Sequence, residues 1–177
     1  VFTPPVRPET GGGSTSSGQM HWDVSVSTLR VSKADVQWDD QLRRKTGQIG
    51  FERIQASDLD GTAPTFDVRG EKGKGQFVLT GQTGRLLPAR GKDFPVQFKL
   101  ALNIAGHPAG LAHLDGRITD PDGARVYALQ TGGSLGQVRD LEQFFPQADL
   151  PDGQNISVDA QIAGAGQQPV VQGLHVH

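Results

Sequence analysis

The residues from Phe94 to Ile104 read FPVQFKLALNI, and this stretch is the clearest indication of the fold. Its six even-numbered positions are all apolar, whereas Gln97, Lys99 and Asn103 fall between them. A period of two is typical of a β-strand with one face buried and the other in water. Pro95 cannot donate a backbone hydrogen bond to a neighbouring strand, so we expect it near the beginning of the strand or at an edge.

Shorter runs with the same period recur along the chain at spacings of roughly 8 to 15 residues. Their apolar members are Trp22, Val24 and Val26; Leu29 and Val31; Ala34, Val36 and Trp38; Ile49, Phe51, Ile54 and Ala56; Phe66 and Val68; Phe77 and Leu79; Ala112, Leu114 and Ile118; Tyr127 and Leu129; Ile156, Val158, Ala160 and Ile162; and Leu174 and Val176. The parity changes near Thr28 and again between Phe51 and Ile54, which predicts a β-bulge or twist at each point.

The joints between these runs carry the residues that turns require. Asp60-Gly61, the segment 70–75, the segment 105–108 and the segment 120–123 supply glycine or proline for a backbone reversal. The sequence therefore predicts an all-β chain of about ten strands, antiparallel, arranged as a curled meander sheet or a β-sandwich-like groove.

One short helix is predicted near 134–145. Ser134 and Gln137 have the spacing of a capping box, and Pro146 would end the segment. Leu135, Val138, Leu141 and Phe145 would form one apolar stripe lying over the open end or face of the sheet.

Composition sets the limits of the domain. The chain has 177 residues, the length of one domain, and its 24 glycines and 11 prolines favour turns over long helices. Residues 1–19 are rich in Pro, Gly and Ser and are predicted to be a flexible linker, with a single β-domain over 20–177. Because the chain begins without Met and the strand over 170–177 stops within its pattern, we expect a fragment of a longer protein.

Charge and residue types exclude several classes of function. A net charge of -2, with acidic and basic residues mixed, gives no electrostatic footprint for nucleic acid. The absence of cysteine removes thiolate metal sites and cysteine nucleophiles. The five histidines, His21, His107, His113, His175 and His177, do not assemble a zinc site by spacing. We therefore predict no metal and no cofactor.

The most catalytic-looking motif is Asp58-Leu59-Asp60-Gly61-Thr62, which resembles the nucleophile motif of haloacid-dehalogenase-like phosphotransferases. Those enzymes need a buried parallel strand before the motif and helices after it, and no such alternation follows here. The glycine-rich segment 70–75 lacks the Ser or Thr that completes a phosphate-binding loop after Lys74. Both segments are better interpreted as turns, and the chain is predicted to be non-enzymatic.

Two longer stretches resemble the AsmA family. The first is VSTLRVSKADVQWDD over 26–40 with the following layer 49–59; the second joins HLDGRITDP over 113–121, the segment from Gly133 through the short helix, Leu150-Pro151 and ISVDA over 156–160. The resemblance covers roughly residues 21 to 177. It implies a long curled sheet with an apolar groove in the periplasm, anchored to the inner membrane through a segment that this chain lacks.

The resemblance also implies a role in phospholipid transport or outer-membrane lipid homeostasis, with phospholipid acyl chains as the ligand. The predicted lining of such a groove is Phe94, Val96, Phe98, Leu100, Leu102 and Ile104 together with Ile156, Val158 and Ile162. The same alternation fits side chains that meet a facing sheet in a dry core. A structural or carbohydrate-binding β-sandwich module of a cell-surface protein is therefore the alternative function.

Overall fold

A computed structural model describes residues 25–40, 45–86, 93–121, 123–145, 148, 150–166 and 170–177. The predicted linker over 1–19 and the strand residues Trp22 and Val24 lie outside these ranges. Within them the strands are β1 (Thr28–Asp40), β2 (Lys45–Ser57), β3 (Thr65–Lys72), β4 (Gly75–Thr83), β5 (Asp93–Ile104), β6 (His107–Thr119), β7 (Val126–Gln137), β8 (Gln154–Ala165) and β9 (Val170–Val176).

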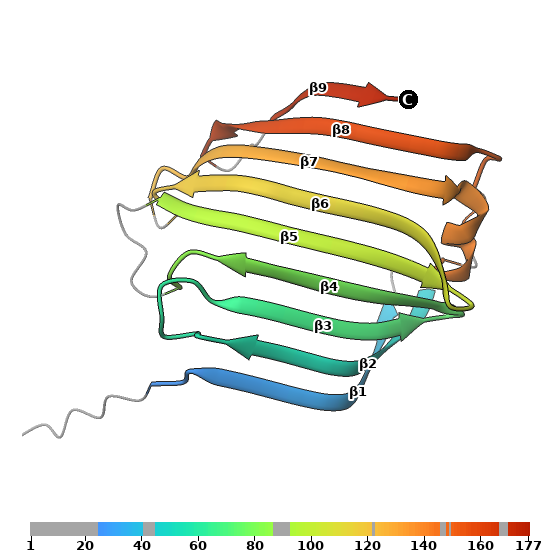
Figure 1. Cartoon of the computed structure of the whole chain (residues 1–177), viewed down its shortest axis with the longest axis horizontal. Coiled ribbons are helices and arrows are strands. Elements are labelled where there is room, and N and C mark those ends of the chain that lie inside the picture. Colours follow the sequence, from blue (N-terminus) through green and yellow to red (C-terminus); the bar gives the residue numbers. More distant parts are fainter. Residues whose placement is uncertain are drawn as a thin grey trace, which may run out of the picture.

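The nine described strands form one antiparallel meander, in which each strand pairs with the next in sequence (Figure 1). β1 and β9 are its two edges. Extensive contacts between strands are confined to these neighbours, so no second sheet packs on the first within the described residues. The all-β prediction is confirmed, and of its two architectures the structure shows the curled single sheet.

Cross-strand register explains why the alternating residues share one side of the sheet. One row of opposed residues crosses all nine strands, and each of its members is apolar: Val31, Ile54, Val68, Leu79, Leu100, Ala112, Gly133, Val158 and Val176. We call it the central row, and the side of the sheet that it faces the apolar face. The opposite side is the polar face.

Aromatic side chains meet across glycines on the apolar face. Gly70 stands opposite both Phe51 and Phe77, whose rings are 6.0 Å apart in an edge-to-face arrangement. On the other side of the central row Gly81 is opposed by Phe66 and Phe98, whose rings are 5.9 Å apart. A glycine between two aromatic residues leaves room for their rings to pack on each other.

The predicted irregularity in β2 is confirmed, because the register with β3 shifts between Phe51 and Arg53. In β1 the chain departs from regular pairing at Lys33, which has φ 53°, rather than at Thr28. Leu29 and Val31 therefore belong to the same strand as Val36 and Trp38. The irregularity at Lys33 exchanges the two faces for the rest of the strand. The odd-numbered apolar residues before it and the even-numbered ones after it therefore lie on the same side of the sheet.

The predicted turns are confirmed at all four joints. Asp58 and Gly61 close the turn after β2 through a hydrogen bond from the Gly61 N–H to the Asp58 carbonyl oxygen (2.9 Å). β3 and β4 are joined by Gly73 and Lys74, and Gly73 has the positive φ of 63° that a tight hairpin favours. The joints after β5 and β6 fall at 105–106 and 120–125.

The helix prediction is wrong in its start and its type. The structure has a 3₁₀ helix, η1 (Val138–Gln143), which makes no side-chain capping hydrogen bond at Gln137. Ser134 and Leu135 instead belong to β7, where they pair with β6 and β8. Strand pairing on both sides holds this segment extended, and that pairing overrides the local capping signal.

Candidate functional site

All nine predicted lining residues lie on the apolar face. Leu100 and Val158 belong to the central row, Leu102 and Ile156 to the next row, and the others follow the same register. Val96 is buried at 8% exposure and Val158 is 36% exposed, while the other seven are partly exposed. A dry core between two sheets would bury most of them, so this face is a surface rather than an interior.

The segment after β7 covers one end of the apolar face. Phe144 follows η1 and is 4% exposed, and its ring lies so close to Gly75 of β4 that a Cβ there would overlap it. The Lys74 N–H donates to the Gln143 carbonyl oxygen (3.2 Å), which ties this segment to the β3–β4 hairpin. Phe144 therefore anchors the cover together with Val138 of the predicted stripe, which is 9% exposed, whereas Phe145 of that stripe is 51% exposed.

The far end of the β1–β2 hairpin approaches the same corner from the other side. Lys72 lies on the apolar face, with its Nζ 4.0 Å from the Phe145 ring centroid and 5.5 Å from the ring centroid of Trp38. In Figure 1 the ends of β1 and β2 are drawn faintly behind the ends of β3 and β4, next to η1. The apolar face is therefore the concave side at this end of the sheet.

The polar face carries a ladder of side chains in register. Its members, which cross β3 to β9, are Thr65, Gln82, Gln97, Asp115, Gln130, Gln161 and Gln172. The Gln82 amide donates to Gln97 Oε1 (3.3 Å), and the Gln97 amide donates to Asp115 Oδ2 (3.0 Å). Gln82, Gln97 and Asp115 thus form a hydrogen-bonded chain across three strands, as expected on a hydrated outer face.

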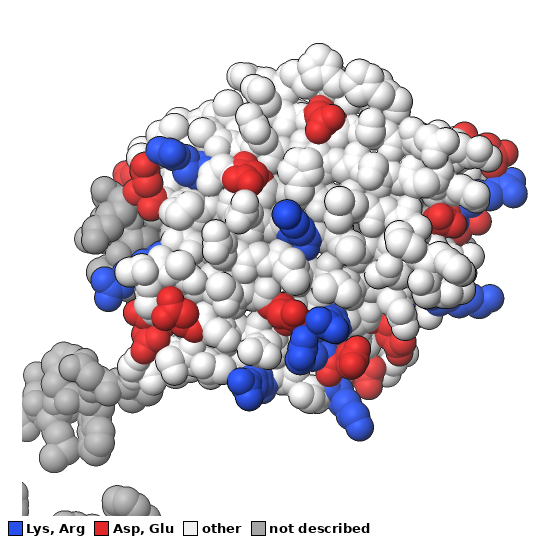
Figure 2. All heavy atoms as spheres, in the orientation of Figure 1, with Lys and Arg blue, Asp and Glu red and all other residues white. Residues whose placement is uncertain are grey.

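Charged groups also lie on this side. Figure 2 shows Lys, Arg, Asp and Glu spread over the face that is toward the viewer, with opposite charges adjoining over the lower strands. By register, the charged residues of β3 to β8 other than Lys72 lie on the polar face. The face in view is therefore the polar one, and the apolar face is turned away.

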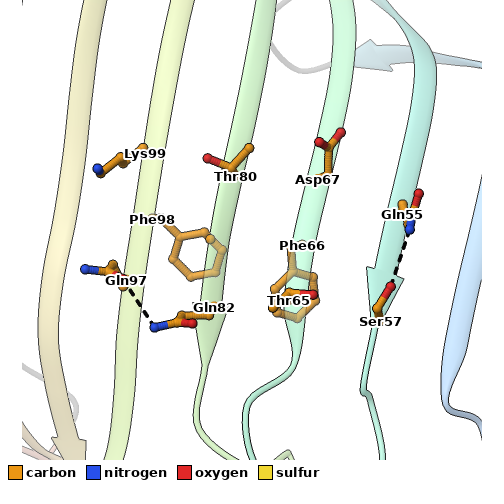
Figure 3. Close-up of a pocket in the computed structure, with 11 residues that line it drawn as sticks. Gln55, Ser57, Thr65, Phe66, Asp67, Thr80, Gln82, Gln97, Phe98 and Lys99 are labelled. Atoms are coloured by element: carbon orange, nitrogen blue, oxygen red, sulfur yellow. Dashed lines mark hydrogen bonds between the residues drawn. The ribbon is translucent and has the colours of Figure 1, made fainter.

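A cavity of about 410 Å³ lies over β2 to β5, among the polar side chains that Figure 3 shows. Asp67, Thr80, Gln82, Gln97 and Lys99 contribute its polar lining. Phe66 and Phe98 also border it, but the register assigns both rings to the apolar face. In fact every aromatic residue of the described strands is on the apolar face: Trp38, Phe51, Phe66, Phe77, Phe94, Phe98 and Tyr127.

Asp67 is the centre of a charged cluster beside this cavity. Its Oδ1 accepts hydrogen bonds from Arg53 Nη2 (3.1 Å) and Arg69 Nε (3.4 Å), and the three side chains are 32 to 48% exposed. Pairs this exposed are screened by water and salt. The cluster therefore joins β2 and β3 through weak, water-exposed ion pairs.

We expect Asp67→Asn to lower the free energy of unfolding by less than about 1 kcal/mol, since exposed ion pairs contribute little. The loss should shrink further in high salt. Urea denaturation at low and high NaCl measures this loss. Asp115→Asn is the control, because among the described side chains the Asp115 carboxylate accepts a hydrogen bond only from the Gln97 amide. A loss of several kcal/mol that salt does not change would contradict this.

The residues that suggested catalysis are placed as turn residues. The Asp58 carboxylate accepts from the Ala63 N–H (3.4 Å), and that of Asp60 accepts from the Ser25 hydroxyl (2.6 Å). His175 and His177 stack on each other at β9, with ring centroids 6.4 Å apart. Among the described residues no group of three or more His, Asp or Glu is placed to hold a metal ion.

Comparisons with family models, with curated proteins and with solved structures gave no match. Within the described residues no helix combines the length and the hydropathy that crossing a membrane requires. Two features of the apolar face are not among the predictions made from the sequence, namely the anchoring ring of Phe144 and the position of Lys72. The parity of Phe66, Val68 and Gly70 already put Lys72 on that face, and this was the signal available.

Proposed function

We propose that this chain is a non-enzymatic, AsmA-like lipid-handling β-domain that binds phospholipid acyl chains on its apolar face. In this proposal it acts in phospholipid transport or in outer-membrane lipid homeostasis. It would work in the periplasm, held at the inner membrane by a segment outside this chain. The resemblance of residues 26–59 and 113–160 to the AsmA family supports the cellular role.

One observation carries the lipid proposal: an apolar row that crosses nine strands has no second layer over it in the described part of the chain. Eight inter-strand spacings of about 4.8 Å give this row a length of about 38 Å. Monomeric proteins rarely leave so large a continuous apolar surface in water, and such a surface marks a binding site. An acyl chain covers it without needing polar partners.

The energetics fit this ligand. Each methylene removed from water contributes about 0.8 kcal/mol, so burial of part of one acyl chain is enough for stable binding. The side chains that would meet it are held by cross-strand packing, as in the Phe66–Phe98 pair. The polar face has the opposite character, because side chains such as Gln82, Gln97 and Asp115 hydrogen-bond one another there.

Native mass spectrometry and lipid extraction of the purified chain test the proposal. We expect phospholipid to copurify, and the melting temperature to rise when phospholipid is added to delipidated protein, because a ligand that binds the folded state stabilises it. A lipid-free preparation whose melting temperature does not change when phospholipid is added would contradict the proposal. The alternative, a structural or carbohydrate-binding module, stays a prediction that glycan-array binding would test.

A further inference from the structure

Lys72 stands out on the apolar face. Within β3 to β8 it is the one residue on this side that carries a full charge, in a row that continues through Gly75 and Ile104. Its neighbours along β3 on the same side are Gly70 and Val68. A lysine costs free energy on such a surface unless its ammonium group finds a partner.

Three segments that are far apart in sequence meet around this ammonium group. Phe145, after η1, and Trp38, near the end of β1, place their rings 4.0 and 5.5 Å from Nζ. The Trp38 ring lies over Gly47 of β2, and Phe144 covers Gly75 beside Lys72. The cation thus lies against two aromatic rings at the end of the apolar face that the segment after β7 covers, which we call the closed end.

The aromatic faces attract the cation but accept none of its N–H groups strongly. An ammonium group has three N–H donors, and in the described residues Lys72 forms no ion pair and no side-chain hydrogen bond. Among the described side chains, an anionic oxygen is the partner that this arrangement lacks. A hydrogen bond between an ammonium group and an anionic oxygen is charge-assisted and roughly twice as strong as one between neutral groups.

Resting on the proposed function, we infer that Lys72 binds the phosphate of a phospholipid headgroup, while the acyl chains extend from there over Leu102 and Leu100. A phosphodiester joined to acyl chains matches both parts of the surface, the Lys72 cation at the closed end and the apolar rows beyond it. The same chemistry makes Lys72, Trp38 and Phe145 the residues that select for a negatively charged headgroup.

The test compares two ligands that differ only in the phosphate headgroup, dihexanoyl phosphatidylglycerol and dihexanoylglycerol, by titration into the delipidated full chain. Lys72→Gln should weaken binding of the phosphatidylglycerol about tenfold or more, since hydrogen bonds to charged groups are strong. It should leave dihexanoylglycerol unchanged. Lys72→Arg should retain most of the affinity, and Lys99→Gln, on the polar face, is the matched control.

Several outcomes would overturn the inference. If Lys72→Gln weakened the binding of both ligands equally, Lys72 would only tie Phe145 to β1. If it weakened the binding of neither ligand, Lys72 would not belong to the binding site. Inorganic phosphate that binds with equal, Lys72-dependent affinity would identify a free-phosphate site instead. If the native chain bound neither lipid, the proposed function itself would fail, whereas binding of both without discrimination would overturn only the headgroup site.

Discussion

Phe144→Ala should lower the free energy of unfolding by about 3 to 5 kcal/mol, the usual cost of truncating a buried phenylalanine. Phe144 is 4% exposed, and its ring fills the space above Gly75. Few large side chains of the described residues are buried this completely, because a single sheet has no opposing layer. The loss would be a large part of the 5 to 15 kcal/mol that stabilises a typical domain.

The adjacent residue supplies the control. Phe145 is 51% exposed and its contact with Lys72 is a cation–π interaction, so Phe145→Ala should cost only about 1 kcal/mol or less. Urea denaturation followed by far-UV circular dichroism compares the two variants. If they unfolded at the same urea concentration, the segment after β7 would not anchor on the sheet through Phe144.

The strands could be predicted from sequence because alternation is a local signal with a direct physical cause. The even-numbered residues of 94–104 share a face in β5, and the parity change between Phe51 and Ile54 marks a real bulge. Turn residues such as Gly73 sit where the backbone needs them. Each of these features depends on residues a few positions apart.

The closed end of the apolar face could not be predicted in the same way. Ser134 and Gln137 satisfy the local rule for a helix start, yet Leu135 is held in β7 by pairing with Gly110 and Ile156. The approach of Trp38 to Lys72 depends on the curvature of β1 and β2, which no short stretch of sequence encodes. Parity predicts the face of a side chain, whereas curl and closure depend on the whole sheet.

Lipid binding should depend on which face of β4 carries a charge, and two neighbouring residues of this strand test that dependence. Leu79 belongs to the central row between Val68 and Leu100, whereas Val78 lies on the polar face between Arg69 and Ala101. Leu79→Asp would put a carboxylate against the acyl chain, where no partner compensates for its lost hydration. We expect copurified phospholipid to fall at least about tenfold, since each 1.4 kcal/mol is a factor of ten.

Val78→Asp makes nearly the same chemical change on the other face of the same strand. Arg69 is its cross-strand neighbour, and an opposite charge there is favourable, so lipid content and melting temperature should stay close to those of the native chain.

Val158→Asp repeats the Leu79 test at a position that is 36% exposed and should therefore tolerate a charge in the folded state. Because Val158 shares the central row with Leu79 across four strands, loss of lipid in both variants, with folding retained in Val158→Asp, would assign binding to the row itself. Retention of lipid in Val158→Asp would confine the ligand to the middle strands, and retention in both would place it on another surface.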